Sequence, residues 1–119
     1  MVRQVGSYQD ATNTAYDILV AGPGLGSGQW DADIMDLLIN DPRPMIVDAD
    51  ALNLLARNDP KSIAGASGER LLTPHPGEMQ RLDPNGEGTR RVRAESLAKR
   101  TGATVLLKGA RTVIASPVE

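Results

Sequence analysis

Apolar runs alternate with helical segments along this chain, and this alternation restricts the fold more than any other sequence feature. Four runs have the length of strands and are bounded by turn or polar residues: 17–21, 45–47, 70–73 and 103–107. Because they do not alternate between apolar and polar positions, we expect them to be buried on both faces. The sequence therefore predicts an α/β fold in which a mainly parallel sheet has helices on both faces, a three-layer α/β/α arrangement.

Helical segments separate these runs. They are predicted over residues 30–40, 51–57, 78–82 and 89–101, and a fifth strand is predicted over residues 112–115. In the first helix, apolar residues recur at helical spacing from Trp30 to Leu38. Asp50 is the expected N-cap of the second helix, and Gly102 is the expected C-cap of the last. Three arginines are interpreted as the solvent-exposed face of that last helix: Arg90, Arg91 and Arg93.

The composition describes one soluble globular domain. The chain has 119 residues, of which 40% are hydrophobic and 24% are charged. A net charge of −2 and an isoelectric point near 5.4 argue against binding to nucleic acid or to an anionic membrane. No apolar run approaches the roughly 20 residues of a membrane span, and the N-terminus lacks the apolar core of a signal peptide. Cysteine is absent, which excludes disulfides and thiolate sites, and a cytoplasmic location fits.

Groups suited to ligand binding directly follow the predicted strands. They are the Gly-rich segment Gly22–Gly26, the pair Asp48 and Asp50, the loop around His75, and Lys108. In parallel α/β sheets, ligands bind beyond the carboxyl ends of the strands. We therefore expect these four groups to lie along one edge of the sheet, where they form the candidate site.

The first two groups each allow a structural and a functional interpretation. The glycines between Gly22 and Gly26 let a ligand approach the backbone closely, but they also suit a tight turn between strand and helix. The segment matches neither the dinucleotide fingerprint nor a Walker A loop. Asp48 and Asp50 could hold a cation or a substrate hydroxyl, although Asp50 serves equally as a helix cap. Asp48 closely follows an apolar strand and needs a partner there, and Asn53 could face the same cleft.

His75 is the only histidine of the sequence and lies between two prolines. Because proline fixes φ and restricts the residue before it, this loop is stiff; its imidazole can meet a polar ligand or simply face solvent. Glu78 is either a carboxylate in the first helical turn or an indirect metal ligand. The run Lys108–Thr112 suits polyphosphate, but it is also typical of a β-turn with a surface lysine. One histidine without cysteine argues against a zinc site.

Taken together, four motifs resemble those of the ADP/ATP-dependent NAD(P)H-hydrate dehydratases, members of the ribokinase-like superfamily that are often labelled carbohydrate kinases. The motifs are Gly22–Gly26, Val47–Asn53, Leu72–Met79 and Leu107–Ala115. The resemblance extends from about residue 17 to residue 117. It implies a ribokinase-like fold, of which residues 1–119 form the central portion of a single domain.

The resemblance implies repair of hydrated NADH or NADPH, with ADP or ATP and Mg²⁺ as cofactors. The terminal phosphate of the nucleotide would pass to the C6 hydroxyl of the damaged nicotinamide ring, and loss of that phosphate would restore the dihydropyridine. The expected substrate-binding residues are Gly24, Gly26, Asp48 and His75. The expected nucleotide-binding residues are Lys108, Gly109, Ala110, Arg111 and Thr112. Glu78 is the expected metal ligand, acting through water.

The chain also departs from the family pattern. It contains neither the family's Gly-Thr-Gly-Asp motif, which supplies the catalytic base and the anion hole, nor the family's N-terminal portion. We therefore interpret it as an internal piece of a longer enzyme or a truncated gene product, and we expect no turnover from it alone. Two other functions stay open: a sugar or hydroxymethylpyrimidine kinase of the same superfamily, and a non-catalytic nucleotide-binding module. Because a sheet cut from a larger one exposes strand edges, we also expect a homo-oligomer.

Overall fold

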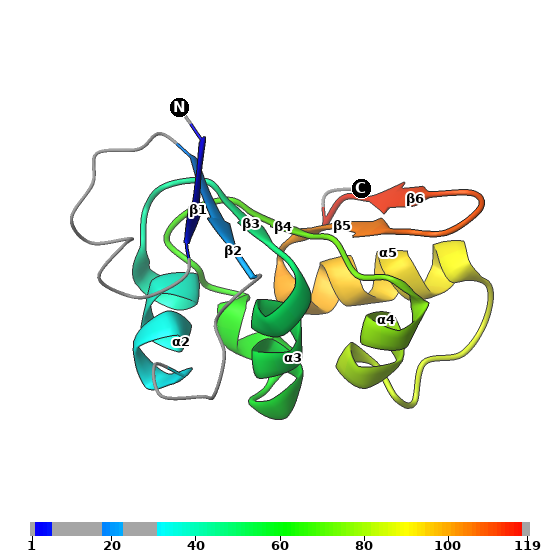
Figure 1. The fold of residues 1–119 in the computed structure, drawn as a ribbon. Coiled ribbons are helices and arrows are strands. Elements are labelled where there is room, and N and C mark those ends of the chain that lie inside the picture. The colour runs from blue at the N-terminus through cyan, green and yellow to red at the C-terminus, as the bar shows by residue number, and fades with distance from the viewer. Residues whose placement is uncertain (1, 6–17, 23–30, 118–119) are drawn as a thin grey trace.

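The computed structural model describes residues 2–5, 18–22 and 31–117, and its strands form one sheet (Figure 1). The strands are β1 (Val2–Val5), β2 (Ile18–Ala21), β3 (Met45–Val47), β4 (Arg70–Leu72), β5 (Thr104–Leu107) and β6 (Val113–Ala115). They lie in chain order across the sheet; neighbours from β1 to β5 are parallel, and β6 runs antiparallel to β5. The predicted α/β class with a mainly parallel sheet is confirmed, whereas β1 has no counterpart in the sequence prediction.

The helices lie close to their predicted positions. They are α2 (Asp31–Asn40), α3 (Ala49–Arg57), α4 (Pro76–Leu82) and α5 (Arg90–Thr101), with the 3₁₀ helix η1 (Pro60–Ile63) after α3. Gly102 is the C-cap of α5 with φ 68°, as predicted. The prediction that Asp50 caps α3 is wrong, because the N-cap is Asp48, whose carbonyl accepts a hydrogen bond from the Ala51 N–H at 3.0 Å. No helix in the described part of the chain is long and apolar enough to cross a membrane.

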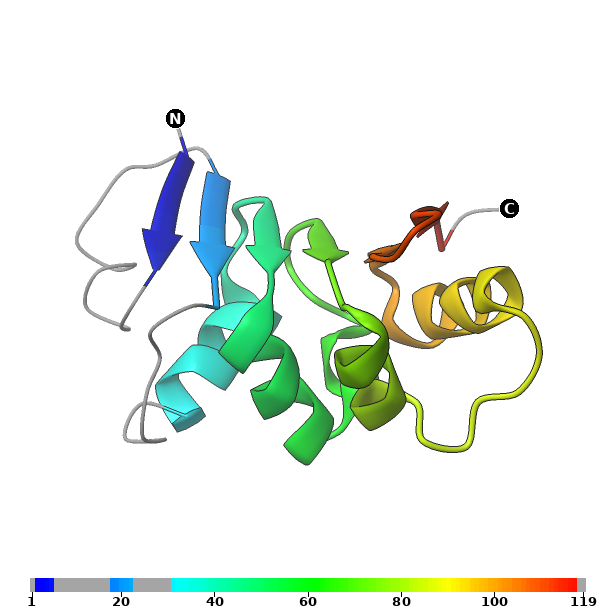
Figure 2. The ribbon, with the colours of Figure 1, turned by 45° about the vertical axis from the view of Figure 1, so that its right-hand side comes forward.

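Helices α2, α3, α4 and α5 cover one face of the sheet (Figures 1 and 2). Because the strands follow chain order, each right-handed crossover puts its helix on the same side. Residues that face the helices are at most 3% exposed: Leu19, Ala21, Met45, Val47, Leu72, Val105 and Leu107. Apolar residues on the opposite face, the open face, are only half-buried: Ile18, Val20, Ile46, Leu71 and Leu106. Strands β2 to β5 thus have one buried face, where the sequence predicted two. In the described part of the chain, helices form one layer against the sheet, and the second helical layer that the sequence predicted is not among these residues.

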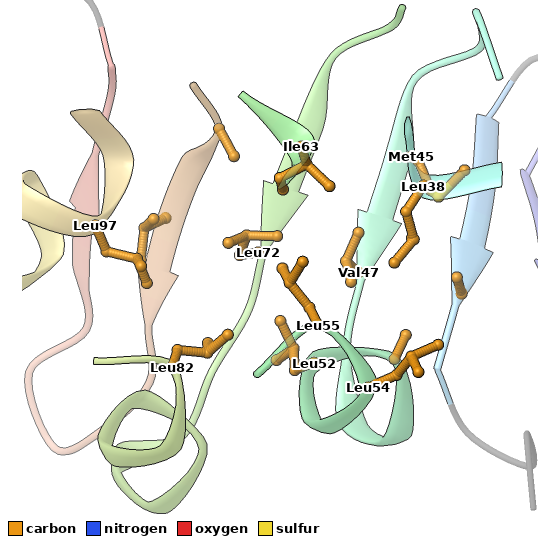
Figure 3. Close-up of a cluster of buried hydrophobic side chains, with 14 of the residues drawn as sticks. Leu38, Met45, Val47, Leu52, Leu54, Leu55, Ile63, Leu72, Leu82 and Leu97 are labelled. Carbon is orange, nitrogen blue, oxygen red and sulfur yellow. The ribbon is translucent and has the colours of Figure 1, made fainter. Parts of the chain in front are cut away.

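The hydrophobic core lies between the buried face of the sheet and the helices (Figure 3). Helix α3 contributes Leu52 and Leu55, both fully buried, which lie beside Val47 and Leu72 of the strands. Full burial of one such leucine stabilises a fold by about 1.5–3 kcal/mol relative to exposure. The core therefore holds α3 against the sheet, and this helix starts at the carboxyl end of β3.

Arg70 of β4 is a cation buried beside this core. The residue is 4% exposed, and its guanidinium donates to the carbonyl oxygens of Leu38 at 2.8 Å and Asp41 at 2.6 Å. A third bond reaches the carbonyl of Arg43 at 2.9 Å. The last carbonyls of a helix lack partners within the helix and carry the negative end of its dipole. Arg70 therefore satisfies the C-terminal end of α2 and ties that helix to the sheet.

Candidate active site

The segments that follow the parallel strands lie side by side at one edge of the sheet. Each is tied to its neighbour by a backbone hydrogen bond: Asp48 N–H to Ala21 O (2.9 Å), Thr73 N–H to Val47 O (3.1 Å) and Lys108 N–H to Pro74 O (2.9 Å). These bonds continue the parallel ladder past the last strand residues. The carboxyl ends of β2, β3, β4 and β5 therefore form one continuous edge, as the sequence predicted.

Gly22 is the residue at which the chain leaves β2, and it passes close to Asp48. A Cβ atom at Gly22 would lie 2.8 Å from the carbonyl carbon of Asp48, closer than real Cβ atoms approach, so only glycine fits here. The first glycine of the segment therefore has a packing role. Gly24 and Gly26 lie outside the described residues, and their role in substrate binding stays a prediction.

Asp48 and Lys108 form an ion pair across the edge, with 3.2 Å between Oδ1 and Nζ. Burial raises the pKa of the Asp48 carboxyl, but the Thr73 hydroxyl, the Lys108 ammonium and the Ala49 N–H together outweigh burial and hold that pKa below its usual value. The carboxylate is therefore charged at neutral pH and stabilises the ammonium beside it. Lys108 is the partner that the sequence required for Asp48.

His75 caps helix α4. Its Nδ1 accepts a hydrogen bond from the Glu78 N–H at 3.1 Å, and Glu78 Oε1 accepts one from the His75 N–H, also at 3.1 Å. This reciprocal pair is a capping box, with Pro76 at the first helical position. The side chain of His75 is still 52% exposed, so it can cap the helix and contact a ligand at the same time. The loop that the prolines stiffen is thus also held by its own side chains.

Glu78 lies in the first turn of α4, one of the two alternatives that the sequence offered. Its side chain is 6% exposed, and its Oε1 takes part in the capping box. Across residues 2–5, 18–22 and 31–117, no three His, Cys, Asp or Glu side chains gather in a way that could hold a metal ion. These residues supply no protein cage for Mg²⁺, and an indirect role for Glu78 through water stays a prediction.

The run Lys108–Thr112 forms the turn between β5 and β6, and residues 109–112 are exposed. Arg90, the first residue of α5, contacts this turn: its guanidinium donates to the carbonyl of Lys108 at 2.9 Å and to that of Arg111 at 2.8 Å. The interpretation of Arg90 as part of a solvent-exposed face is therefore wrong. No sequence signal marks this contact, because 18 residues separate Arg90 from Lys108 and only the folded chain brings them together.

Asn53 is bonded to a neighbouring helix, and one surface hollow lies at the opposite ends of the strands. The Oδ1 of Asn53, a predicted neighbour of the site, accepts a hydrogen bond from Arg81 of α4 at 3.0 Å, so this side chain links two helices. A hollow of about 510 Å³ is lined by Ile18, Pro44 and Glu69, among others, at the amino ends of the strands. Because Asp48 and Lys108 follow the opposite ends of the strands, this hollow is separate from the candidate site.

Comparison with known proteins gives a consistent likeness. A family profile described as NAD(P)H-hydrate dehydratase matches residues 1–119, the whole chain. The bifunctional NAD(P)H-hydrate repair enzyme Nnr of Escherichia coli K12 is 42% identical over 104 residues, and that of Mycobacterium tuberculosis H37Rv is 46% identical over 99 residues. These matches cover 84% and 82% of this chain but 19% and 21% of the relatives. The chain therefore spans about one fifth of the length of these curated relatives.

Solved structures share the fold. An ADP/ATP-dependent NAD(P)H-hydrate dehydratase from Bacillus subtilis, co-crystallised with ATP and Mg²⁺, matches with a TM-score of 0.73 and 28% identity. The match covers 92% of this chain and 40% of that one. A ribokinase-like superfamily protein from Enterococcus faecalis matches with a TM-score of 0.68 and 25% identity, over 84% of this chain and 36% of that one. The ribokinase-like fold predicted from the motifs is therefore confirmed.

Proposed function

Because this chain belongs to the NAD(P)H-hydrate dehydratase family, we propose that it carries the central part of an enzyme that repairs hydrated NADH or NADPH. The C6 hydroxyl oxygen of the damaged ring attacks the terminal phosphorus of ADP or ATP: a new P–O bond forms at that oxygen, the hydroxyl proton passes to the family's aspartate base, and the terminal P–O bond of the nucleotide breaks, so that AMP or ADP leaves. The C6–O bond then breaks with loss of phosphate and a ring proton, which restores the dihydropyridine. We expect this enzyme to be cytoplasmic and homo-oligomeric.

The observation that carries the proposal is the meeting of two of the family motifs at one edge of the sheet. The N–H of Lys108 donates to the carbonyl of Pro74, so the lysine turn begins beside the loop that presents His75. A transfer of phosphate needs a nucleotide and an acceptor held next to each other. In our proposal, the run Lys108–Thr112 binds the nucleotide phosphates, while His75 and Asp48 contact the hydrated dinucleotide, together with Gly24 and Gly26.

Mg²⁺ neutralises phosphate charge when it is bound, and it is usually held by phosphate oxygens and waters with one or two carboxylates. The only carboxylate in our proposed metal contact, Glu78, is engaged in the cap of α4. Glu78 would therefore act on the ion through water. Lys108 supplies a second positive charge for the phosphates from this chain itself.

Turnover requires groups that this sequence does not contain. The family's aspartate base and anion hole belong to a Gly-Thr-Gly-Asp motif, which is absent from these 119 residues. We therefore expect the purified chain to bind ligands without converting hydrated NADPH. Dehydration of hydrated NADPH by the chain alone, followed by recovery of the absorbance of NADPH, would contradict this expectation.

The alternative in the same superfamily is a small-molecule kinase. Sugar kinases of that superfamily resemble this chain but carry Asn-x-x-Glu where His75 and Glu78 stand, so the histidine favours the dehydratase. Calorimetric titrations with hydrated NADPH and with hydroxymethylpyrimidine separate the two functions. Binding of ADP alone, with neither acceptor, would instead favour the non-catalytic nucleotide-binding module.

Two substitutions of His75 test its role in the site. Asparagine is as good an N-cap as any residue, so His75→Asn keeps the cap of α4, whereas His75→Ala removes it at a cost of about 1 kcal/mol. If the imidazole contacts the hydrated dinucleotide, both variants lose affinity for hydrated NADPH, but only His75→Ala unfolds at lower urea. Unchanged affinity in His75→Asn would show that His75 only caps the helix, and it would contradict this part of the proposal.

A further inference from the structure

Arg90, the first residue of α5, forms several hydrogen bonds with the turn that follows β5. Its Nη1 donates to the carbonyl of Arg111 at 2.8 Å, and its Nη2 donates to that of Lys108 at 2.9 Å and lies 3.3 Å from that of Leu107. One guanidinium thus binds carbonyls at both ends of the turn. Such a planar fork holds several acceptors at fixed angles, which an ammonium cannot do.

Gly109 has no side chain, and this leaves room for the guanidinium of Arg90. A Cβ atom at Gly109 would lie 2.9 Å from Cζ of Arg90, closer than real Cβ atoms approach. The φ angle of Gly109 is not left-handed, since the positive-φ glycines in the described part of the chain are Gly88 and Gly102. A side chain at position 109 would therefore have to displace the guanidinium of Arg90, and the backbone conformation of Gly109 sets no such condition.

The dipole of α5 gives no reason for an arginine at this position. The N-terminal end of a helix carries partial positive charge, where carboxylates are favourable and cations are not. The first turn of α5 has no acidic residue and begins with Arg90. Its neighbour Arg91 lies on the solvent-exposed face, as the sequence predicted: its side chain is 81% exposed, and it forms an ion pair with Glu95 at 2.9 Å. The position of Arg90 is therefore explained by the turn and not by α5.

We propose that Arg90 is a positioning residue that shapes the turn 108–112 for nucleotide phosphate; this inference rests on the proposed function of that turn. Lys108 is then held at three points. Its N–H donates to the carbonyl of Pro74, its own carbonyl accepts from Arg90, and its Nζ pairs with Asp48. Carbonyl oxygens repel phosphate, and those that Arg90 binds are kept from turning toward an anion. The guanidinium also places a second positive charge beside Lys108.

Two measurements on the purified chain test the inference: hydrogen–deuterium exchange of the amides in residues 109–112, and calorimetric titration with ADP. In Arg90→Ala we expect faster exchange in the turn and ADP binding weaker by at least about tenfold, equivalent to about 1.4 kcal/mol. Arg90→Lys keeps the charge but not the fork, so it should recover only part of both properties. Arg91→Ala removes the same charge one residue away and should leave both within about twofold.

A double-mutant cycle with Gly109→Ala makes the test specific. The added methyl group displaces the guanidinium, so Gly109→Ala should weaken ADP binding about as much as Arg90→Ala does. Because each change breaks the same contact, the double variant should bind no worse than Arg90→Ala alone. Effects that simply add would overturn the inference.

The two hypotheses fail in different ways. If the unaltered chain does not bind ADP, the proposed function of the turn is wrong, and the inference that rests on it falls as well. If the unaltered chain binds ADP and Arg90→Ala binds it equally well, the proposed function stands and the inference is overturned, whatever the exchange rates are. Urea unfolding of every variant identifies any loss of affinity that is due to a loss of folding.

Discussion

At the scale of single residues, the candidate site depends on one ion pair. Asp48 and Lys108 are 60 residues apart in the chain, yet their charged atoms lie 3.2 Å apart. The side chains are 30% and 43% exposed, respectively, so we expect the pair to add only about 1 kcal/mol or less to stability. Its main effect is to hold an ammonium at the sheet edge, beside the turn that we assign to phosphate.

Asp48→Asn should change how stability depends on pH. The pKa of Asp48 in the folded chain lies below its usual 3.8, so the charged carboxylate stabilises the fold above about pH 4, and this contribution is lost as the pH falls through the folded pKa. We expect the variant to be less stable than the parent at pH 7, by about 1 kcal/mol or less, and the difference to shrink as the pH falls below the usual pKa of 3.8. Urea unfolding at several pH values, followed by circular dichroism, measures it.

Glu87→Gln is the matched control for this experiment, because it removes the same charge from an exposed position. Its stability difference from the parent should show no comparable loss on acidification. A difference between Asp48→Asn and the parent that grows as the pH falls would contradict the assignment of the ion pair.

Ala49 carries backbone strain next to Asp48. Its φ is 46°, in the left-handed region that costs an alanine about 1–2 kcal/mol relative to glycine. Ala49→Gly relieves this strain but adds freedom to the unfolded chain, so we expect the free energy of unfolding to rise by up to about 1 kcal/mol. Ala56→Gly, in the last turn of the same helix, should lower it by up to about 1 kcal/mol. Equal losses from both substitutions in urea unfolding would show that Ala49 is not strained.

At the scale of helices and strands, Arg70 decides whether α2 ends with its carbonyls satisfied. Arg70→Lys keeps a positive charge but cannot reach the carbonyls of Leu38, Asp41 and Arg43 at once. Buried acceptors without a donor cost about 1–3 kcal/mol each, so we expect the free energy of unfolding to fall by about 2–4 kcal/mol. Arg91→Lys is the exposed control and should change it by less than about 0.5 kcal/mol. A loss in Arg70→Lys no larger than in this control would contradict the capping role.

The elements could be predicted from the sequence wherever the pattern is local. The runs at 45–47 and 103–107 are short and bounded by turn or polar residues, and they form the strands Met45–Val47 and Thr104–Leu107. Strand β1 was missed because Val2–Val5 has two polar residues among its four and no turn signal before it. The start of α3 was misplaced because Asp48 and Asp50 are equally good caps by type. In the structure, the residue that caps α3 is Asp48, and Gly22 packs closely against it; no local sequence pattern reveals this contact.

The sequence predicted where the groups of the candidate site lie, but it did not predict the contacts between their side chains. The groups lie along one edge because parallel strands bring their carboxyl ends together. The backbone hydrogen bonds made by the N–H groups of Asp48, Thr73 and Lys108 agree with this rule. This rule does not predict which side chains of different helices, strands and loops contact one another. The pairing of Asp48 with Lys108, the engagement of Glu78 by His75 and the reach of Arg90 depend on distances that only the folded chain defines.

At the scale of the whole molecule, the open face of the sheet is the least protected surface. Ile18, Val20, Ile46, Leu71 and Leu106 are half-buried there with no described helix above them. Ile114 of β6 pairs with Leu106 of β5 and is 68% exposed, so it extends the same apolar surface to the last strand of the sheet. Apolar surface of this kind and unpaired strand edges both favour association between chains.

We therefore expect the purified chain to associate with itself, and Ile114→Lys to weaken that association. The lysine replaces the most exposed apolar side chain next to the open face with a charge, and charges on outer strands oppose pairing between sheets. Val92→Lys makes the same chemical change at a residue 51% exposed on α5, away from that face, and should leave association unchanged. Light scattering across a concentration series gives the mass of each variant. A parent chain that stays monomeric at all concentrations would refute the expectation, and equal weakening by both lysines would show that the association does not depend specifically on the open face.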